Sequence, residues 1–203
     1  SLITDPADGR LPPMTPEGIK RRDDNLAAMK RVAAGPDDRA LQERCITYGS
    51  PSLVAGYQSA YEIVQASDTV ALTLEMIHDT RVIPLDQRPH LAPAVRQWLG
   101  DSRGHWEGDT LVIETANYKP RSFMSRSSEQ LHVVERLSQT GPNTLKYEMT
   151  INDPGTWTRP WSLMIPLRRA DHPMYEYGCH EGNYGMAGIL AGARAEERAA
   201  GPR

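Results

Sequence analysis

The sequence lacks the features that mark several large classes of protein. It has no run of about 18 apolar residues, so no segment predicts a membrane-spanning helix. It has no P-loop, no dinucleotide-binding fingerprint and no Gly-x-Ser-x-Gly elbow, which argues against nucleotide-dependent enzymes and α/β-hydrolases. Its 23 basic residues are scattered and fewer than its 26 acidic residues, so nucleic acid is not an expected partner.

Cysteine is also scarce, since the chain contains only Cys45 and Cys179. Two readings stay open: a pair of buried free thiols, or one disulfide in an exported protein. A disulfide here would close a loop of roughly a hundred residues or more and would stabilise the fold by about 4–5 kcal/mol in the chain-entropy model. The chain begins at Ser1 without a signal-like segment, which we interpret as a removed targeting segment or a trimmed sequence.

What the sequence does contain is a series of short segments in which apolar and polar residues alternate. The length of 203 residues favours a single domain. Alternation with a period of two predicts strands, and Gly, Pro, Asn and Asp between the segments predict short turns. The predicted strands cover residues 57–65, 69–76, 79–85, 110–118, 129–139, 144–152, 161–167 and 174–180.

The ends of the chain predict different structure. Residues 1–16 are rich in proline and predict an extended lead-in, and residues 100–109 predict a turn-rich segment. Residues 92–99 predict one or two helical turns. Thr15 and Pro16 have the residue types of a helix start, and residues 186–203 predict a helical tail rich in Ala, Glu and Arg.

About eight strands joined by short turns predict an antiparallel, mainly β fold with helices at both ends. Closure into a barrel removes exposed strand edges, so we expect an up-and-down barrel of lipocalin-like type. A barrel of this size can hold one small ligand. A two-sheet sandwich is the alternative fold.

Five segments resemble those of a family of exported bacterial proteins, and the similarity covers most of the chain from Leu2 to the C-terminal helix. The resemblance implies a periplasmic or secreted location and favours a disulfide between Cys45 and Cys179. It implies no mechanism. The segments include the motifs WEGDTLV, SExLHxxER and DPxTWTRPW, and they cover residues 86–91, 106–112, 128–136, 153–161 and 175–183.

The strand at residues 129–139 carries the strongest candidate for chemistry. Because alternate residues of a strand share a face, Glu135 falls on the same face as Leu131 and Leu137. Burial disfavours the charge of an unpaired carboxylate, which suits a general acid or base near neutral pH. Glu135 is therefore a predicted catalytic residue, with a buried ion pair as the alternative. His132 falls on the other face and is a second candidate, with a structural histidine as the alternative.

Residues 75–81 place further ionisable groups in or beside a strand. If one strand continues through them, Glu75 and Arg81 share a face and His78 lies on the other. Arg81 is predicted to clamp a carboxylate or polarise a carbonyl, and His78 to transfer protons. A salt bridge at the edge of the sheet is the alternative for Arg81.

Residues 176–181 combine carboxylate, histidine and cysteine. In a strand, Glu176 and His180 share a face and Cys179 lies on the other. We predict Glu176 and His180 as catalytic residues. The spacing matches no zinc module, so we expect no cofactor, with a metal site as a less favoured alternative.

Three further residues are predicted to contact a ligand. His90 lies in a charged loop, where ligand-contacting groups often gather. Tyr147 and Trp161 lie in alternating strands and could stack on a ligand, with an ordinary core role as the alternative.

These residues predict a small-molecule site and leave its function open. The first hypothesis is a cofactor-independent acid–base enzyme, a lyase, isomerase or hydrolase. The second is a lipocalin-like carrier of a small apolar or aromatic ligand, and the third is a metal-dependent enzyme on the same fold. Ionisable residues embedded in strands favour the enzyme, since a carrier of apolar ligands more often has an aliphatic and aromatic lining.

Overall fold

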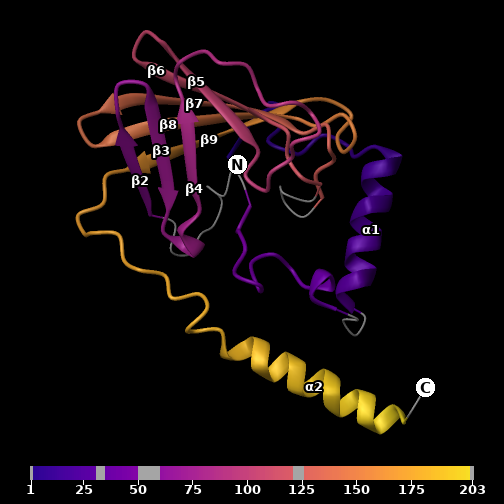
Figure 1. The fold of residues 1–203 in the computed structure, drawn as a ribbon. Coiled ribbons are helices and arrows are strands. Elements are labelled where there is room, and N and C mark those ends of the chain that lie inside the picture. The colour runs from indigo at the N-terminus through magenta and orange to yellow at the C-terminus, as the bar shows by residue number, and fades with distance from the viewer. Residues whose placement is uncertain (1, 31–34, 50–59, 121–125, 202–203) are drawn as a thin grey trace.

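The structure is a computed structural model that describes residues 2–30, 35–49, 60–120 and 126–201. It is mainly β, with two antiparallel sheets of six and three strands and a helix towards each end of the chain (Figure 1). Seven of the eight predicted strands are present, most of them with slightly different bounds. Residues 57–59 of the first predicted strand lie outside the described residues.

The large sheet has the strand order β1-β9-β8-β7-β6-β5. Tight turns join β5 to β6 and β7 to β8, so these neighbours pair along almost their whole length. The strands are β1 (Ile3–Asp5), β5 (Asp101–Glu107), β6 (Thr110–Ala116), β7 (His132–Gly141), β8 (Thr144–Asn152) and β9 (Trp161–Arg168).

The small sheet has the order β2-β3-β4, with β2 at Tyr61–Gln65, β3 at Thr69–Leu74 and β4 at Thr80–Pro84. A short 3-10 turn, η2 (Met76–His78), joins β3 to β4, and a second one, η1 (Pro36–Asp38), follows the first helix. In Figure 1 the small sheet lies against one side of the large sheet.

The predicted closed barrel is wrong. Within the described residues, β2 and β4 remain edges of the small sheet, and β1 and β5 remain edges of the large sheet. Packing explains why β4 and β5 do not form a ladder. A Cβ atom added to Gly104 of β5 would lie 2.7 Å from Leu85 and 2.8 Å from Ile83, so side chains from the end of β4 rest on the backbone of β5. The arrangement is compatible with the alternative of a two-sheet sandwich.

The hydrophobic core lies between the two sheets. Burial alternates along β7 and along β3, as expected for strands with one face on a core. Both sheets contribute to one apolar cluster, which includes Val70, Leu72 and Ile83 from the small sheet and Ile113, Val133, Tyr147, Met149, Ile151, Trp161 and Leu163 from the large sheet.

Three other predictions of local structure are also wrong. The turn-rich segment at residues 100–109 contains β5, because pairing with all seven residues of β6 overrides the weak strand propensity of its Asp, Ser and Gly. The lead-in at residues 1–16 contains β1, which pairs with β9. Residues 92–99 form turns and a single bridge instead of helical turns, because Gln97 pairs with Tyr118.

The predicted strand at residues 174–180 is likewise absent from the structure. This segment is extended and then turns, and side chains of the small sheet's β3–β4 connection hold its backbone. The Tyr175 amide donates to Glu75 Oε1 at 3.1 Å, and the Tyr177 amide donates to His78 Nε2 at 3.2 Å. Side-chain acceptors therefore satisfy amides that a neighbouring strand would otherwise bind.

The two helices differ in how they contact the sheets. Helix α1 (Pro16–Lys30) begins where Thr15 and Pro16 predict, and the Gly18 amide donates to Thr15 Oγ1 at 2.9 Å. Arg21 of α1 donates to the Gly155 carbonyl at 3.2 Å, which ties the helix to the turn before β9. Helix α2 (Tyr184–Ala200) has no buried residue and stands away from both sheets (Figure 1). Among the described residues, no helix has the length and apolar character needed to cross a membrane.

A disulfide joins Cys45 and Cys179, as the resemblance implies. It links the loop after η1 to the segment that leads into α2. Asn183 adds a contact at the same place, since its side chain donates to the Glu43 carbonyl at 2.8 Å. The disulfide therefore anchors the C-terminal segment close to the small sheet.

We expect removal of this disulfide to release the C-terminal segment while the sheets stay folded. In the double variant Cys45→Ser/Cys179→Ser, the amides of Tyr175 and Tyr177 should exchange with solvent much faster, because one part-buried and one exposed hydrogen bond then protect them without the covalent anchor. Hydrogen exchange followed by mass spectrometry measures this, with β7 and β8 as the internal control. Unchanged exchange at residues 173–180, or faster exchange in β7, would contradict the expectation.

Candidate functional site

A cavity of about 590 Å³ opens beside the first residues of β4 and β5. The loop that precedes β5 forms one wall, and the segment at Ile46 and Thr47 forms another. We call it the basic cavity, because its described lining has three cationic and two acidic side chains. Its charged and aromatic lining consists of Asp79, Arg81, Arg96, Trp98, Asp101 and Lys119.

Two of the cations are held in place by neighbours in the wall. Arg96 donates to the carbonyls of Tyr118 at 3.2 Å and Glu129 at 2.9 Å, and its guanidinium lies 3.4 Å from the Glu129 carboxylate. The Lys119 ammonium lies 4.8 Å from the centre of the Trp98 ring, a cation–π contact. The cavity thus combines positive charge with an aromatic ring.

The third cation, Arg81, connects the cavity to the core. Its guanidinium makes a bidentate ion pair with Glu135, with N–O distances of 2.6 and 2.7 Å, and the Tyr147 hydroxyl donates to the same carboxylate. Glu135 is 0% exposed, so the pair lies between the sheets, with Arg81 from β4 and Glu135 from β7. We call these three residues the buried cluster.

The electrostatics of the buried cluster favour the charged form of Arg81 and the neutral form of Tyr147. Burial raises the pKa of Tyr147 well above its ordinary value, and the adjacent Glu135 charge raises it further. Burial disfavours the charge of Arg81, but Glu135 outweighs this effect and raises the pKa of Arg81. Both Glu135 oxygens are engaged by these partners, so Glu135 acts as the counter-ion of Arg81 in this arrangement.

Asp79 is the acid of the cavity whose charge is least favoured. Burial raises its pKa above the ordinary value of 3.8, although two hydrogen bonds act in the opposite direction. These come from the Tyr48 amide at 2.8 Å and the Thr47 hydroxyl at 2.7 Å, both to Oδ2. Of the two acids in the described lining, Asp79 is therefore the one whose protonated form burial favours.

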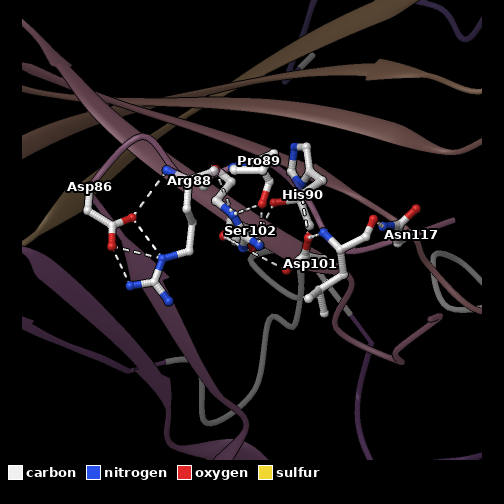
Figure 2. A network of polar contacts seen from close by, with 10 residues as sticks. Asp86, Arg88, Pro89, His90, Asp101, Ser102 and Asn117 are labelled. Atoms are coloured by element: carbon white, nitrogen blue, oxygen red, sulfur yellow. Dashed lines mark hydrogen bonds and ion pairs between the residues drawn. The ribbon is translucent and has the colours of Figure 1, made fainter.

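Asp101, at the other side of the cavity, is the centre of a network of polar contacts (Figure 2). One carboxylate oxygen accepts from the Leu91 amide at 2.8 Å and lies 3.0 Å from His90 Nδ1, and the other accepts from Arg103 at 2.6 Å. Burial opposes the charge, yet these hydrogen bonds together lower the pKa of Asp101. Asp101 is therefore held as an anion.

The same network organises the charged loop before β5. Arg103 donates to the carbonyls of Arg88 and Pro89, and the Asn117 side chain donates to the Leu91 carbonyl at 2.9 Å. Arg88 in turn forms an exposed ion pair with Asp86, which lowers the pKa of Asp86 to about 2 (Figure 2). These contacts fix the loop that forms one wall of the basic cavity.

Gly100 is required in this wall for two reasons. Its φ of +70° is a conformation that other residues rarely adopt. A Cβ atom there would lie 2.6 Å from the Thr115 side chain and 2.8 Å from the Tyr118 ring. A larger residue would therefore displace the start of β5 and reshape the cavity.

The structure brings together three of the nine predicted site residues, Arg81, Glu135 and Tyr147, in the buried cluster. Glu135 forms a buried ion pair, which is the alternative predicted for it from the sequence. Arg81 also forms an ion pair, but its partner is this carboxylate in the core and not a residue at the edge of the sheet.

The remaining six predicted residues lie elsewhere. His132 is on the opposite face of β7, 3.9 Å from Glu114, and His90 belongs to the Asp101 network. Trp161 is buried in the core at 5.9 Å from Trp157, a ring-to-ring contact. The others are exposed on or near the C-terminal segment: His78, Glu176 and His180.

Sequence reasoning missed Asp79, Arg96, Asp101 and Lys119 as lining residues. They lie in loops and at strand ends, where side-chain direction does not follow from periodicity. In the sequence, Trp98 is close to Gly100 and Lys119 is close to the end of β6. Nothing in the sequence indicates that the segments around Trp98 and Lys119 meet in the fold. Among the described residues, no group of three or more His, Cys, Asp or Glu side chains is arranged to hold a metal ion.

We expect Glu135→Gln to destabilise the fold by about 3–5 kcal/mol, because it leaves the buried Arg81 charge without its counter-ion. Tyr147→Phe removes one hydrogen bond to a charged group and should cost less, about 1.5–3 kcal/mol. Urea unfolding measures both. Glu114→Gln, on the outer face of the neighbouring strand, is the control and should change stability by less than about 0.5 kcal/mol. Equal stability of Glu135→Gln and the control would contradict the role of the pair.

The two acids of the basic cavity should give opposite pH dependences of stability. The pKa of Asp79 is raised in the folded state. Its contribution to stability is therefore complete below the ordinary value of 3.8 and is lost as the pH rises through the folded pKa. A lowered pKa contributes stability above that value that is lost as pH falls, as expected for Asp101. As the pH rises from about 3 to about 6, the free energy of unfolding of wild type should fall relative to that of Asp79→Asn. Over the same range it should rise relative to that of Asp101→Asn. Urea unfolding across this range tests both signs, and parallel slopes would refute the assignment.

Comparisons of the chain with protein-family models, curated proteins and solved structures found no match. The resemblance to a family of exported bacterial proteins therefore stays a prediction from the sequence.

Proposed function

We propose that the protein binds a small organic carboxylate in the basic cavity. The observation that carries this proposal is the Lys119 ammonium beside the Trp98 ring in the lining, since Arg81 and Arg96 already pair with Glu135 and Glu129. Of the two acids in the described lining, Asp101 is occupied by Arg103 and His90, and burial disfavours the charge of Asp79. An anion is therefore the ligand that the field of the cavity favours.

The size and lining of the cavity support a small ligand with no more than a few rings. A volume of about 590 Å³ lies within the range of small-molecule sites, and Trp98 supplies an aromatic surface beside Lys119. The Arg81–Glu135 pair supports one wall of the cavity, because it holds β4 against β7.

An NMR titration with benzoate tests the proposal, with benzyl alcohol and benzylamine as the neutral and cationic analogues. Benzoate should bind saturably and more tightly than either analogue. Lys119→Gln should weaken benzoate binding by about fivefold or more, since it removes one charge from the lining. Lys20→Gln, on the exposed surface of α1, is the matched control and should bind as wild type does.

Two outcomes of the titration would overturn the proposal. One is the absence of saturable binding by benzoate. The other is equal binding of benzoate and benzyl alcohol, because the charge of the lining would then play no part in recognition.

An acid–base enzyme at the same cavity is the second candidate, and the raised pKa of Asp79 is the observation that favours it. We assign proton transfer to Asp79 in preference to Glu135, because both Glu135 oxygens already have partners. The NMR samples separate the two functions. Ligand signals that shift and persist indicate binding alone, whereas new signals that Asp79→Asn abolishes indicate chemistry.

We place the protein, with either of these functions, in an oxidising compartment, the periplasm or the exterior of the cell. The Cys45–Cys179 disulfide supports this location, because structural disulfides persist mainly in exported proteins.

A further inference from the structure

A second cavity, of about 810 Å³, lies at a different opening between the sheets. It is bounded by β2 on one side and by the ends of β8 and β9 and the segment after β9 on the other. We call it the β2–β9 groove. It shares no lining residue with the basic cavity among the residues that the structure describes.

The floor of the β2–β9 groove is apolar. Leu145, Ile165 and Leu167 come from the inner faces of β8 and β9, where they extend the main core and remain partly exposed. Tyr61 and Ile63 come from the facing side of β2, and Ile63 is 40% exposed. The core thus reaches the surface here as a strip of aliphatic and aromatic side chains.

One end of this floor carries positive charge. Arg169 follows β9 and lies in the same wall as His172, three residues further on. Arg168 falls on the opposite face of β9 from Ile165 and Leu167. The Arg169 amide donates to the Asn143 carbonyl at 2.9 Å, which fixes its backbone beside the β7–β8 turn. The acidic side chain of the described lining, Glu62, is on the opposite face of β2 from Ile63.

We propose that the β2–β9 groove binds an amphipathic carboxylate, a medium-chain fatty acid in chemical class. The alkyl chain lies on the floor formed by Ile63, Ile165 and Leu167, and the carboxylate meets Arg169. Burial of the chain supplies most of the affinity, and the Arg169 guanidinium determines which end of the ligand is charged. This site is independent of the carboxylate site proposed for the basic cavity.

Isothermal titration with decanoate tests the site, with decanol and decyltrimethylammonium as analogues of the same chain length. Decanoate should bind saturably and more tightly than both analogues. The exposed variant Arg169→Gln should bind decanoate about fivefold more weakly, whereas Arg168→Gln, on the opposite face of β9 from Leu167, should bind it as wild type does. Arg159→Gln, which lies just before β9 and pairs with Asp5, is the control and should bind as wild type does.

A pair of adjacent residues on β2 tests the floor. Ile63 faces the groove and Val64 faces the outer surface of the small sheet, and both are substantially exposed, so polar substitution leaves the fold intact. Ile63→Gln should weaken decanoate binding by about fivefold, whereas Val64→Gln should leave it unchanged. Lys119→Gln, in the basic cavity, should also leave it unchanged.

Three results would overturn the proposal. They are the absence of saturable decanoate binding, equal affinity for decanol and decanoate, and equal effects of Ile63→Gln and Val64→Gln. Loss of decanoate binding in Lys119→Gln would place the ligand in the basic cavity and would likewise overturn it.

Discussion

The ion pair between Arg81 and Glu135 is the interaction on which the arrangement of the two sheets depends. Two charges in an apolar core are tolerated only when they pair closely and their remaining hydrogen-bonding capacity is used. The bidentate geometry and the Tyr147 hydroxyl meet this condition. Because Arg81 belongs to β4 and Glu135 to β7, any slip of the small sheet over the large sheet would separate the charges. The pair therefore specifies one register of the sheets.

Both proposed binding sites follow from the failure of the sheets to close. At one opening, side chains from the end of β4 rest on Gly104 of β5, and the basic cavity forms beside this contact. At the other, β2 and the ends of β8 and β9 stay apart, and the β2–β9 groove exposes the margin of the core. The charged lining of the first opening comes from loops and the first residues of strands, and the apolar floor of the second comes from the strands β2, β8 and β9. This difference in origin gives the two cavities different chemistry.

Sequence reasoning identified most of the strands and the correct face of Glu135, but it misjudged β5. Asp101, Ser102, Arg103 and Gly104 have the composition of a turn, and only pairing with β6 makes them a strand. The same pairing brings Asp101 to His90 and the Leu91 amide. A segment whose structure depends on distant partners therefore gave no local signal of its role.

The features that followed from the sequence alone are those that depend on neighbours along the chain. The period of two placed Glu135 among apolar residues, and Thr15 and Pro16 set the start of α1, because backbone geometry relates nearby residues directly. The three-dimensional packing sets which distant groups meet. It brings Arg81 to Glu135, lays β4 over β5 in place of a closed ladder, and gathers Arg96, Trp98 and Lys119 around one cavity. Contacts of this kind depend on the packing of whole sheets, since no local pattern records the position of a partner many residues away.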